Sequence, residues 1–509
     1  MAGQRTRRIE LGPDEVALPG LTDSHLHLAE AALAVDQVQL TEAATLDAAL
    51  DRIRAAHAGL EPGAWLTGNG WSADRWGAWP TAAQLETVAP GRLVALWAHD
   101  HHALWVSHAA LAIAGLGPAS RDPAGGAIRR ESDGAPSGVL QETATALVSA
   151  RVPEPTAATF EAVIPALCRQ LVELGVVAVH DPGLLRPDPH LGGPHVAYGA
   201  LANAGHLPIR VFASLRVEAL ELAVERGLRS ADALGGDPLG RARLGWLKLF
   251  ADGSLGSRTA AMLEPFEPDL RLDTPPGAEG QGDRGIWLTP PERLLELTAR
   301  AAAVGIATQI HGIGDAAVRA ALDAFEPDAT RRLPLRARIE HAQLVDPLDA
   351  PRFGRLGVVA SIQPVHLRSD AETARRAWGS RATRSGYAWR TLARSGATLA
   401  FGTDAPVEPI DPWPGLALAL NRSWPGWPAG TPPFGPHEAL TLDEALRGAC
   451  LGPAQAEGST DRGRLTVGQR ADLVVIPAAG LTPPIEADGP LATTRPRLVL
   501  IDGRIAYEA

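Results

Sequence analysis

The chain has 509 residues, of which 45% are hydrophobic and 21% are charged, and its formal net charge at pH 7 is -11. This length suits one large domain with a smaller companion, and the composition is that of a globular protein. The acidic excess disfavours nucleic acid or an anionic membrane surface as a partner, and no apolar run approaches the ~18 residues of a membrane span. A small-molecule substrate is the expected partner. The oligomeric state is left open, with a homodimer as one option.

The N-terminus carries Arg5, Arg7 and Arg8, but no apolar segment follows them. The sequence therefore predicts no secretory signal and a cytoplasmic location. The two cysteines, Cys168 and Cys450, lie in apolar helical patterns. This pattern favours buried thiols over a disulfide or a thiolate metal site.

Among the 47 basic residues, Lys248 is the single lysine. Chance survival in an arginine-rich composition is one explanation. The functional hypothesis is that position 248 requires an amine with a lone pair, which a guanidinium group does not supply.

Eight short apolar runs alternate with helical patterns, at 16–21, 176–180, 209–213, 244–250, 306–310, 337–340, 358–362 and 398–401. Helices are expected between several of them, for instance at 160–174 and 291–304, the latter ended by Gly305. Alternating strands and helices indicate an α/β fold with a parallel sheet. Eight such units predict a (β/α)8 TIM barrel with its active site at the C-terminal ends of the strands.

A stretch rich in Trp, Gly and Pro, at about 61–150, separates the first two runs. An insertion of this size in a barrel is expected to wall or cover the active site. After the eighth run come a helical stretch, 442–450, and strand-like pieces at 471–476 and 497–501. Asp502-Gly503 then indicates a hairpin. We therefore expect a small β-sandwich domain formed by residues 1–16 plus 462–509, and a barrel formed by residues 17–461.

Metal-ligand residue types follow five of the eight runs. His25 and His27 have the i, i+2 spacing that puts both imidazoles on one side of an extended segment. The others are Lys248, His311, His341 and Asp404, at the ends of the fourth, fifth, sixth and eighth runs. Each alone has an ordinary explanation as a loop residue or helix cap. Together they could complete two cation sites with an open position for water.

On these motifs the chain resembles the amidohydrolase superfamily, and within it the amidohydrolase 3 branch that includes N-substituted formamide deformylase. The resemblance covers almost the whole chain. It extends to Gly68-Asn-Gly-Trp71, Gly138-Val-Leu-Gln-Glu142, Asp252-Gly-Ser-Leu-Gly-Ser257 and Gln363-Pro-Val-His366. Members of the family normally begin with several strands of the small sandwich, whereas only some sixteen residues precede the first run here, which predicts a reduced N-terminal half.

The resemblance implies two divalent metals, Zn²⁺ being the expected ion, bridged by a carboxylated Lys248. His25 and His27 would bind the first metal and His311 and His341 the second, with Asp404 as ligand and proton shuttle. The implied catalytic residues are Asp404, Lys248 and His311. The implied reaction is hydrolysis of a C–N bond in an amide, N-formyl, cyclic amide or carbamate-like substrate by metal-activated hydroxide.

Four further residues are candidates for binding substrate. Trp71, His102 and His366 could line the pocket, and Asp252, with Arg258 nearby, could contact substrate or brace the carbamate. A purely structural role is the alternative for each of them. Two other functions stay open: a mononuclear deaminase of the same superfamily, and a non-catalytic regulatory or ligand-binding protein on the same scaffold.

Overall fold

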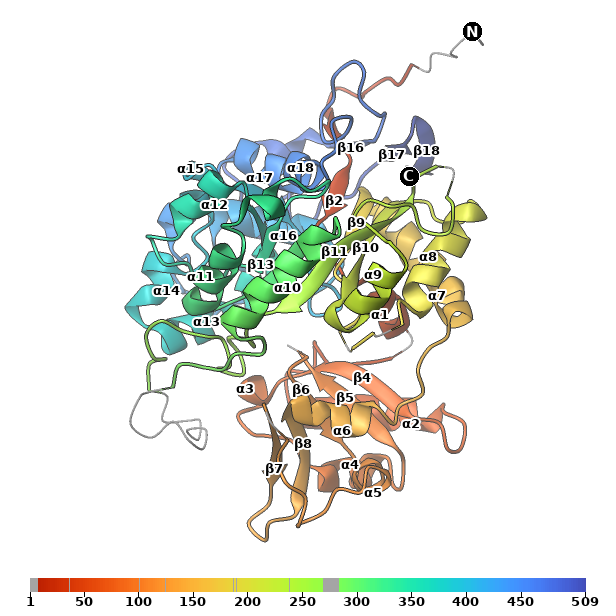
Figure 1. Cartoon of the computed structure of the whole chain (residues 1–509), viewed down its shortest axis with the longest axis vertical. Coiled ribbons are helices and arrows are strands. Elements are labelled where there is room, and N and C mark those ends of the chain that lie inside the picture. The colour runs from red at the N-terminus through yellow and green to blue at the C-terminus, as the bar shows by residue number, and fades with distance from the viewer. Residues whose placement is uncertain are drawn as a thin grey trace.

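The structure, a computed structural model, describes residues 8–509 except 36, 100, 124, 186, 189, 238 and 269–282. Three sheets organise the described residues. An eight-stranded sheet forms the barrel, a six-stranded sheet lies at one end of the molecule, and a four-stranded sheet lies toward the other end (Figure 1). Among the described residues, no helix is both long enough and apolar enough to cross a membrane.

The barrel strands pair in parallel, each with its neighbour, from the first strand round to the last. They are β2 (Leu21–Asp23), β9 (Val176–Asp181), β10 (Arg210–Arg216), β11 (Ala242–Phe250), β12 (Thr308–Gly312), β13 (Arg338–His341), β14 (Val359–Ile362) and β15 (Thr398–Phe401). At the remaining edge, the backbone N–H of Ser24 donates to the carbonyl of Phe401 at 2.8 Å. The predicted (β/α)8 barrel is confirmed, with its first and last strands joined at their C-terminal ends.

Helices surround the barrel, and several of them bury an apolar face against it. In α7 (Ala157–Glu173), Phe160, Ile164, Leu167 and Leu171 recur at helical spacing and are all buried. The expected helix at 291–304 is α10 (Pro291–Ala303). The other helices after β2 are α1 (Leu28–Ala34), α8 (Gly193–Asn203), α9 (Leu220–Glu225), α11 (Asp315–Ala324), α12 (Ala350–Leu356), α13 (Leu367–Trp378), α14 (Ser380–Ser385), α15 (Trp389–Arg394), α16 (Pro412–Asn421), α17 (Leu442–Ala449) and α18 (Leu451–Ala456). Cys168 and Cys450 are both free and buried, as predicted.

The first apolar run, 16–21, is not a single barrel strand. It is divided between β1 (Glu15–Pro19), which pairs antiparallel with β16 (Leu473–Pro477), and β2 of the barrel. Gly20 lies at the break, where an added Cβ would come within 2.6 Å of a methyl carbon of Val177. The run 16–21 is apolar on both sides of Gly20, so hydropathy does not reveal that the chain changes sheets there.

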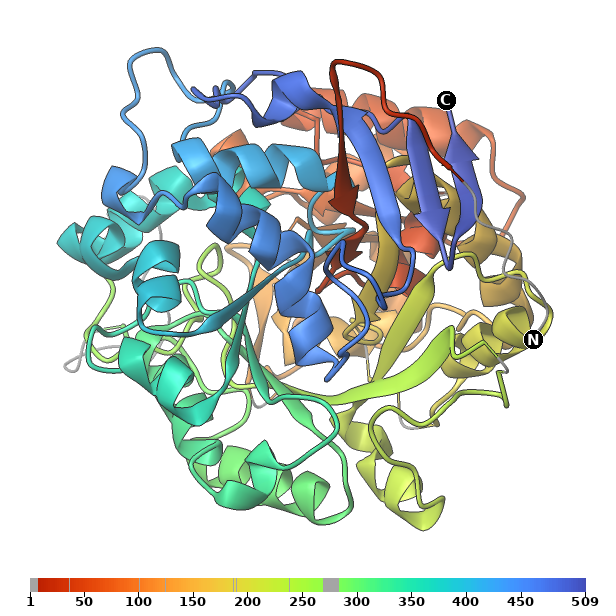
Figure 2. The same cartoon turned by 90° about the horizontal axis from the view of Figure 1, so that it is seen from above.

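The four-stranded sheet combines the two ends of the described chain. Its order is β1-β16-β17-β18, with β17 (Leu498–Ile501) and β18 (Arg504–Glu508) joined by the predicted hairpin at Asp502 and Gly503. Figure 2 shows the red N-terminal strand beside the blue C-terminal strands. The composite character is as predicted, but the strands of the described residues at these ends form one antiparallel sheet rather than a two-layered sandwich, because the N-terminal segment contributes a single strand.

The insertion forms the six-stranded sheet, in the order β3-β4-β5-β6-β8-β7. Its strands are β3 (Val38–Gln39), β4 (Leu66–Trp71), β5 (Val94–Ala98), β6 (Ala103–Val106), β7 (Gly126–Arg130) and β8 (Pro136–Glu142); its helices are α2 (Leu46–Ala58), α3 (Ala73–Trp76), α4 (Ala82–Val88), α5 (His108–Ile113) and α6 (Ala146–Ser149). The sheet also includes β3, which precedes residue 61. Apolar clusters separate from the barrel core pack around this sheet.

The contact between β15 and the segment after β2 allows a first prediction. A Cβ added at Gly402 would lie 2.5 Å from the backbone nitrogen of His25, and a backbone atom cannot turn aside as the end of a flexible side chain can. Gly402→Ala should therefore lower the free energy of unfolding by about 1–3 kcal/mol, measured from urea denaturation. Gly117→Ala is the control, because nothing lies within 4 Å of a Cβ there. Equal stability of the two variants would show that the close packing at Gly402 is not required.

Candidate metal centre

The six predicted ligands all lie at the C-terminal mouth of the barrel, and all are buried. His25 and His27 follow β2, Lys248 lies near the end of β11, and His311 lies near the end of β12. His341 is the last residue of β13, and Asp404 follows β15. Because the strands are parallel, their carboxyl ends meet at one mouth and bring these distant residues together.

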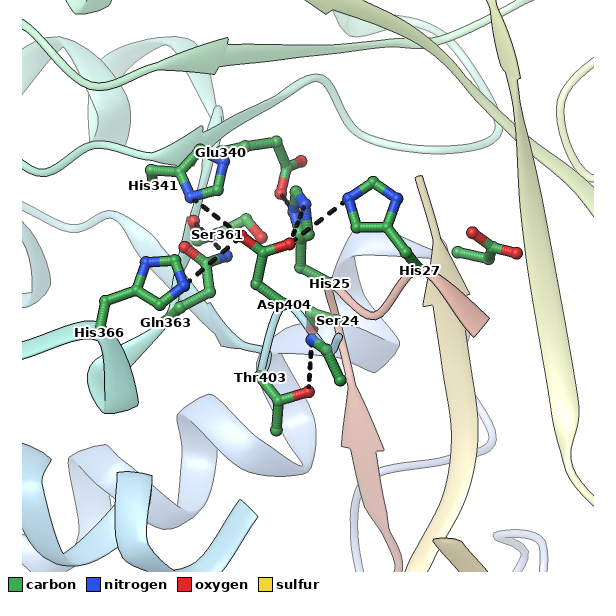
Figure 3. Close-up of polar contacts among 12 residues, drawn as sticks. Ser24, His25, His27, Glu340, His341, Ser361, Gln363, His366, Thr403 and Asp404 are labelled. Carbon is green, nitrogen blue, oxygen red and sulfur yellow. Dashed lines mark hydrogen bonds and ion pairs between the residues drawn. The ribbon is translucent and has the colours of Figure 1, made fainter. Parts of the chain in front are cut away.

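The carboxylate of Asp404 lies at the centre of a ring of imidazoles (Figure 3). Its Oδ1 is 3.4 Å from Nε2 of His25 and 3.4 Å from Nε2 of His27. Its Oδ2 is 3.5 Å from Nε2 of His366 and 3.9 Å from Nδ1 of His341. His25, His341 and Asp404 each place one potential ligand atom within 4.8 Å of the others.

One ring nitrogen in each of three of the predicted histidine ligands is held by a fixed partner. Nδ1–H of His25 donates to the carboxylate of Glu340, and Nδ1–H of His27 donates to the carbonyl of Gly183 at 2.6 Å. Nε2–H of His311 donates to the carbonyl of Gly253 at 2.9 Å. Each bond selects one tautomer and leaves the other ring nitrogen with a lone pair, which is the form that binds a metal.

A cation fits this donor set. Nε2 of His25, Nδ1 of His341 and Oδ1 of Asp404 are buried and have no hydrogen-bond partner among the described residues. Lone pairs of imidazoles that face a carboxylate, with no proton between them, repel one another unless a positive charge lies among them. Two imidazoles and a carboxylate are also the ligand types that divalent transition metals prefer.

The backbone around the centre is strained. His341 has φ 70° and Asp404 has φ 62°, although neither is glycine. Such conformations cost free energy and persist where the surrounding structure enforces them, most often at functional sites. Here they turn the side chains of two ligands away from the strand direction and toward the common centre.

Lys248 is buried close to the acidic groups of this centre. Burial lowers the pKa of Lys248 to about 8, although the charges of Glu340 and Asp404 act in the opposite direction. Its Nζ lies 4.6 Å from the ring centroid of Phe250. A considerable fraction of this amine is therefore neutral near neutral pH, which is the form that could react with CO₂.

The four candidate substrate residues have different surroundings. His366 faces Asp404, as described above, and the ring centroid of His102 lies 6.4 Å from that of His311. Asp252 accepts hydrogen bonds from the backbone N–H groups of Ala261, Ile313 and Gly314, so it braces the loops after β11 and β12.

Trp71 packs in the core of the inserted sheet, which favours the structural alternative given for it. It is 1% exposed within the core of the inserted sheet, and its indole N–H donates to the carbonyl of Leu96 at 2.7 Å. An aromatic residue beside two glycines carries no signal in the sequence that distinguishes core packing from a pocket wall. Arg258, which was named with Asp252 as a possible substrate contact, forms an ion pair with Asp283 at 3.2 Å.

Glu340 is an important residue that the sequence reasoning missed. Besides His25, it binds Arg338, whose Nε donates to Glu340 at 2.6 Å and whose Nη2 donates to the carbonyl of Ser24 at 2.5 Å. Both side chains are fully buried. The sequence did contain one sign of this role. Arg338 and Glu340 are charged residues two positions apart in the buried strand β13, so both side chains lie on the face directed into the barrel.

Comparison with known proteins now identifies the family. A family model described as amidohydrolase family matches residues 14–507. The chain belongs to the amidohydrolase family. Similar family members include the putative amidohydrolase YtcJ of Bacillus subtilis, 28% identical over 97% of this chain and 89% of that protein. N-substituted formamide deformylase of Arthrobacter pascens is 27% identical over 97% of this chain and 89% of that protein.

A plant protein and a solved structure are also similar to this chain. Protein LONG AFTER FAR-RED 3 of Arabidopsis thaliana is 31% identical over 93% of this chain and 80% of that protein. An uncharacterized metal-dependent hydrolase of Pyrococcus horikoshii, known from its crystal structure, is 28% identical, with a TM-score of 0.71 over 91% of this chain and 86% of that chain. Family and neighbours together support a metal-dependent hydrolase, and His25, His341 and Asp404 form a group that could hold a metal ion.

The requirement for a cation at this centre can be tested on Asp404→Asn. Without metal, this variant should be more stable than the wild type by about 1–3 kcal/mol, because the amide removes a buried charge and offers an N–H to the imidazole lone pairs. With zinc at about 100 times its dissociation constant, the wild type should gain about 2.7 kcal/mol and the variant little. Thermal denaturation with and without zinc measures both effects.

Asp443→Asn, at an exposed position on α17, is the control and should behave like the wild type. Equal stabilisation of Asp404→Asn and wild type by zinc would contradict the assignment of Asp404 as a ligand.

Proposed function

We propose that this metal-dependent hydrolase cleaves a C–N bond in an amide, N-formyl, cyclic amide or carbamate-like substrate, at a centre of two divalent cations, with Zn²⁺ as the expected ion. The observation that carries the proposal is that ligand atoms of His25, His341 and Asp404 converge at the mouth of the barrel without a hydrogen-bond partner among the described residues. The deformylase relative, whose name describes action on N-substituted formamides, supports the choice of bond.

In this proposal His25 and His27 would hold one cation, His311 and His341 would hold the other, and a carbamate on Lys248 would supply a further anionic ligand. The carbamate forms when the neutral Nζ of Lys248 adds to the carbon of CO₂ and releases one proton, so a lysine becomes an anionic ligand. The cations, when bound, supply a Lewis acid for the scissile carbonyl and a water of lowered pKa.

Asp404 is the proton carrier in the proposal. Its carboxylate accepts the proton of the attacking water and returns it to the leaving nitrogen, so no covalent intermediate is formed with the protein. A bound cation would favour the ionised form of this buried carboxylate, which is the form that accepts a proton.

A mononuclear deaminase is the second candidate. It is favoured by the short distances among His25, His341 and Asp404, whose ligand atoms lie close enough together to hold a single ion without Lys248 or His311. The two candidates differ in the number of cations and in the chemical state of Lys248.

The metal content and the intact mass of the protein distinguish the binuclear hydrolase from the mononuclear deaminase. Protein purified without chelator should contain two metal equivalents by elemental analysis, and its intact mass in native conditions should exceed the sequence mass by about 44 Da. It should also release 4-nitroaniline from 4-nitroformanilide. One metal equivalent without the added mass would favour the deaminase, and metal-free protein that takes up no metal in bicarbonate would overturn both candidates.

Lys248→Arg tests the carbamate with the positive charge retained. It should lose one metal equivalent and the added mass, with activity falling by about 10²-fold or more, because guanidinium cannot form the bridging ligand. Acetate added to Lys248→Ala should restore part of the activity by supplying a carboxylate in place of the carbamate. Retention of both metals by either variant without added carboxylate would contradict a bridging role for Lys248.

A further inference from the structure

A cavity of about 180 Å³ lies at the end of the barrel opposite the metal centre. Arg210, the first residue of β10, and Arg243, the second residue of β11, line its wall, so it lies at the N-terminal ends of these strands. The segment between α18 and β16 contributes Glu457, Asp461, Arg462 and Arg470 to the wall. A space of this size holds several water molecules or a small ion.

Positive charge dominates the wall of this cavity. Four guanidinium groups line it, against the two carboxylates of Glu457 and Asp461. Asp472 and Asp502 accept hydrogen bonds from Arg210, but neither of them is a residue of the wall. The surface that a ligand would meet is therefore cationic, which favours an anion.

The surroundings of Arg462 show the effect of this crowding of like charges. Its side chain is 9% exposed and pairs with the fully buried carboxylate of Glu457. Its guanidinium group lies 5.9 Å from the ring centroid of Phe212. Burial lowers the pKa of Arg462 to about 9, and the charges of Arg210 and two other arginines of the wall act in the same direction. An anion in the cavity would reduce this repulsion.

The arginines of the wall also keep N–H groups for a ligand. Nη1 of Arg243 donates to the carbonyl of Ala231 at 2.8 Å, and Arg243 forms no ion pair with a carboxylate among the described residues. Gly240 lines the cavity beside Nη2 of Arg243, where an added Cβ would come within 2.7 Å of that nitrogen. Nε and Nη1 of Arg470 donate to two carboxylates, which leaves its Nη2. Since a guanidinium group has five N–H donors, both arginines retain some for a ligand.

We propose that this cavity binds phosphate or the phosphoryl group of a small molecule. Its guanidinium groups come from β10, from β11 and from the segment after α18, so they reach the cavity from different directions. A tetrahedral phosphate presents oxygens in several directions, whereas a carboxylate presents two in one plane, and the fork of an arginine matches phosphate well. The site is separate from the metal centre and does not depend on the proposed hydrolysis.

Calorimetry with inorganic phosphate on the metal-loaded protein gives the first test, with the ionic strength held constant by sodium chloride. The wild type should bind phosphate with a dissociation constant of about 1 mM or lower. Arg243→Gln should weaken binding at least about tenfold, because it removes charge-assisted donors without leaving a carboxylate unpaired. Arg464→Gln is the control and should bind like the wild type, because Arg464 is exposed on the same segment and does not line the cavity.

Asp404→Asn distinguishes the cavity from the metal centre, where phosphate could bind a cation. This variant should keep the binding that Arg243→Gln loses, because the two sites lie at opposite ends of the barrel. Binding that is lost in Asp404→Asn and kept in Arg243→Gln would place phosphate at the metal centre and overturn the proposal. A wild type that binds no phosphate at ten times the expected dissociation constant would overturn it as well.

Thermal denaturation shows whether the variants fold and provides a second readout. Without phosphate, Arg243→Gln and Arg464→Gln should both unfold cooperatively. Phosphate should raise the Tm of the wild type and of Arg464→Gln more than that of Arg243→Gln. Equal shifts of the wild type by phosphate and by sodium chloride of the same ionic strength would contradict a phosphate site.

Glycerol 3-phosphate distinguishes the two sources of the phosphoryl group in the same calorimetric assay. Tighter binding than that of inorganic phosphate, lost in Arg243→Gln, would support the proposal with an organic phosphate as the ligand. Weaker binding, also sensitive to Arg243→Gln, would support it with the free ion as the ligand. Binding of either compound that is unchanged in Arg243→Gln would overturn the assignment of the cavity.

Discussion

The buried carboxylate of Asp404 faces imidazole nitrogens that carry lone pairs rather than protons, and the rest of the site depends on this arrangement. Electrostatic repulsion among such groups is relieved by a cation, so the site is organised for an ion before one binds. For His25 and His27, Glu340 and the carbonyl of Gly183 enforce it by occupying the other ring nitrogens. The positive φ angle of Asp404 shows that the backbone conformation serves the same end.

The barrel supports this centre from below as well as from the sides. Arg338 lies fully buried under the site, where it donates to Glu340 and to the backbone of Ser24 and contacts Nδ1 of His180 at 2.8 Å. A charge at this depth is tolerated because it is paired and its donors are satisfied. The packing that closes the barrel thereby also orients His25, so the fold and the site depend on the same interactions.

Much of the site could be predicted because ligand chemistry and strand order are local properties of the chain. His25, His27, Lys248, His311, His341 and Asp404 each follow an apolar run, and parallel strands bring such positions to one mouth. The roles of Glu340 and Trp71 could not be predicted in this way. Glu340 acts through a contact with a residue 315 positions away in sequence, and Trp71 packs in a core assembled from several segments of the insertion.

The sequence by itself determined the barrel class, the ligand types and the presence of an insertion, because periodicity, residue chemistry and length are written along the chain. The tertiary structure decided that residues 16–21 are shared between two sheets, that the chain ends form one four-stranded sheet, and that His102 and Glu142 of the insertion reach the barrel mouth. These features depend on which segments meet in space, and pairing between distant segments leaves no mark in hydropathy or spacing.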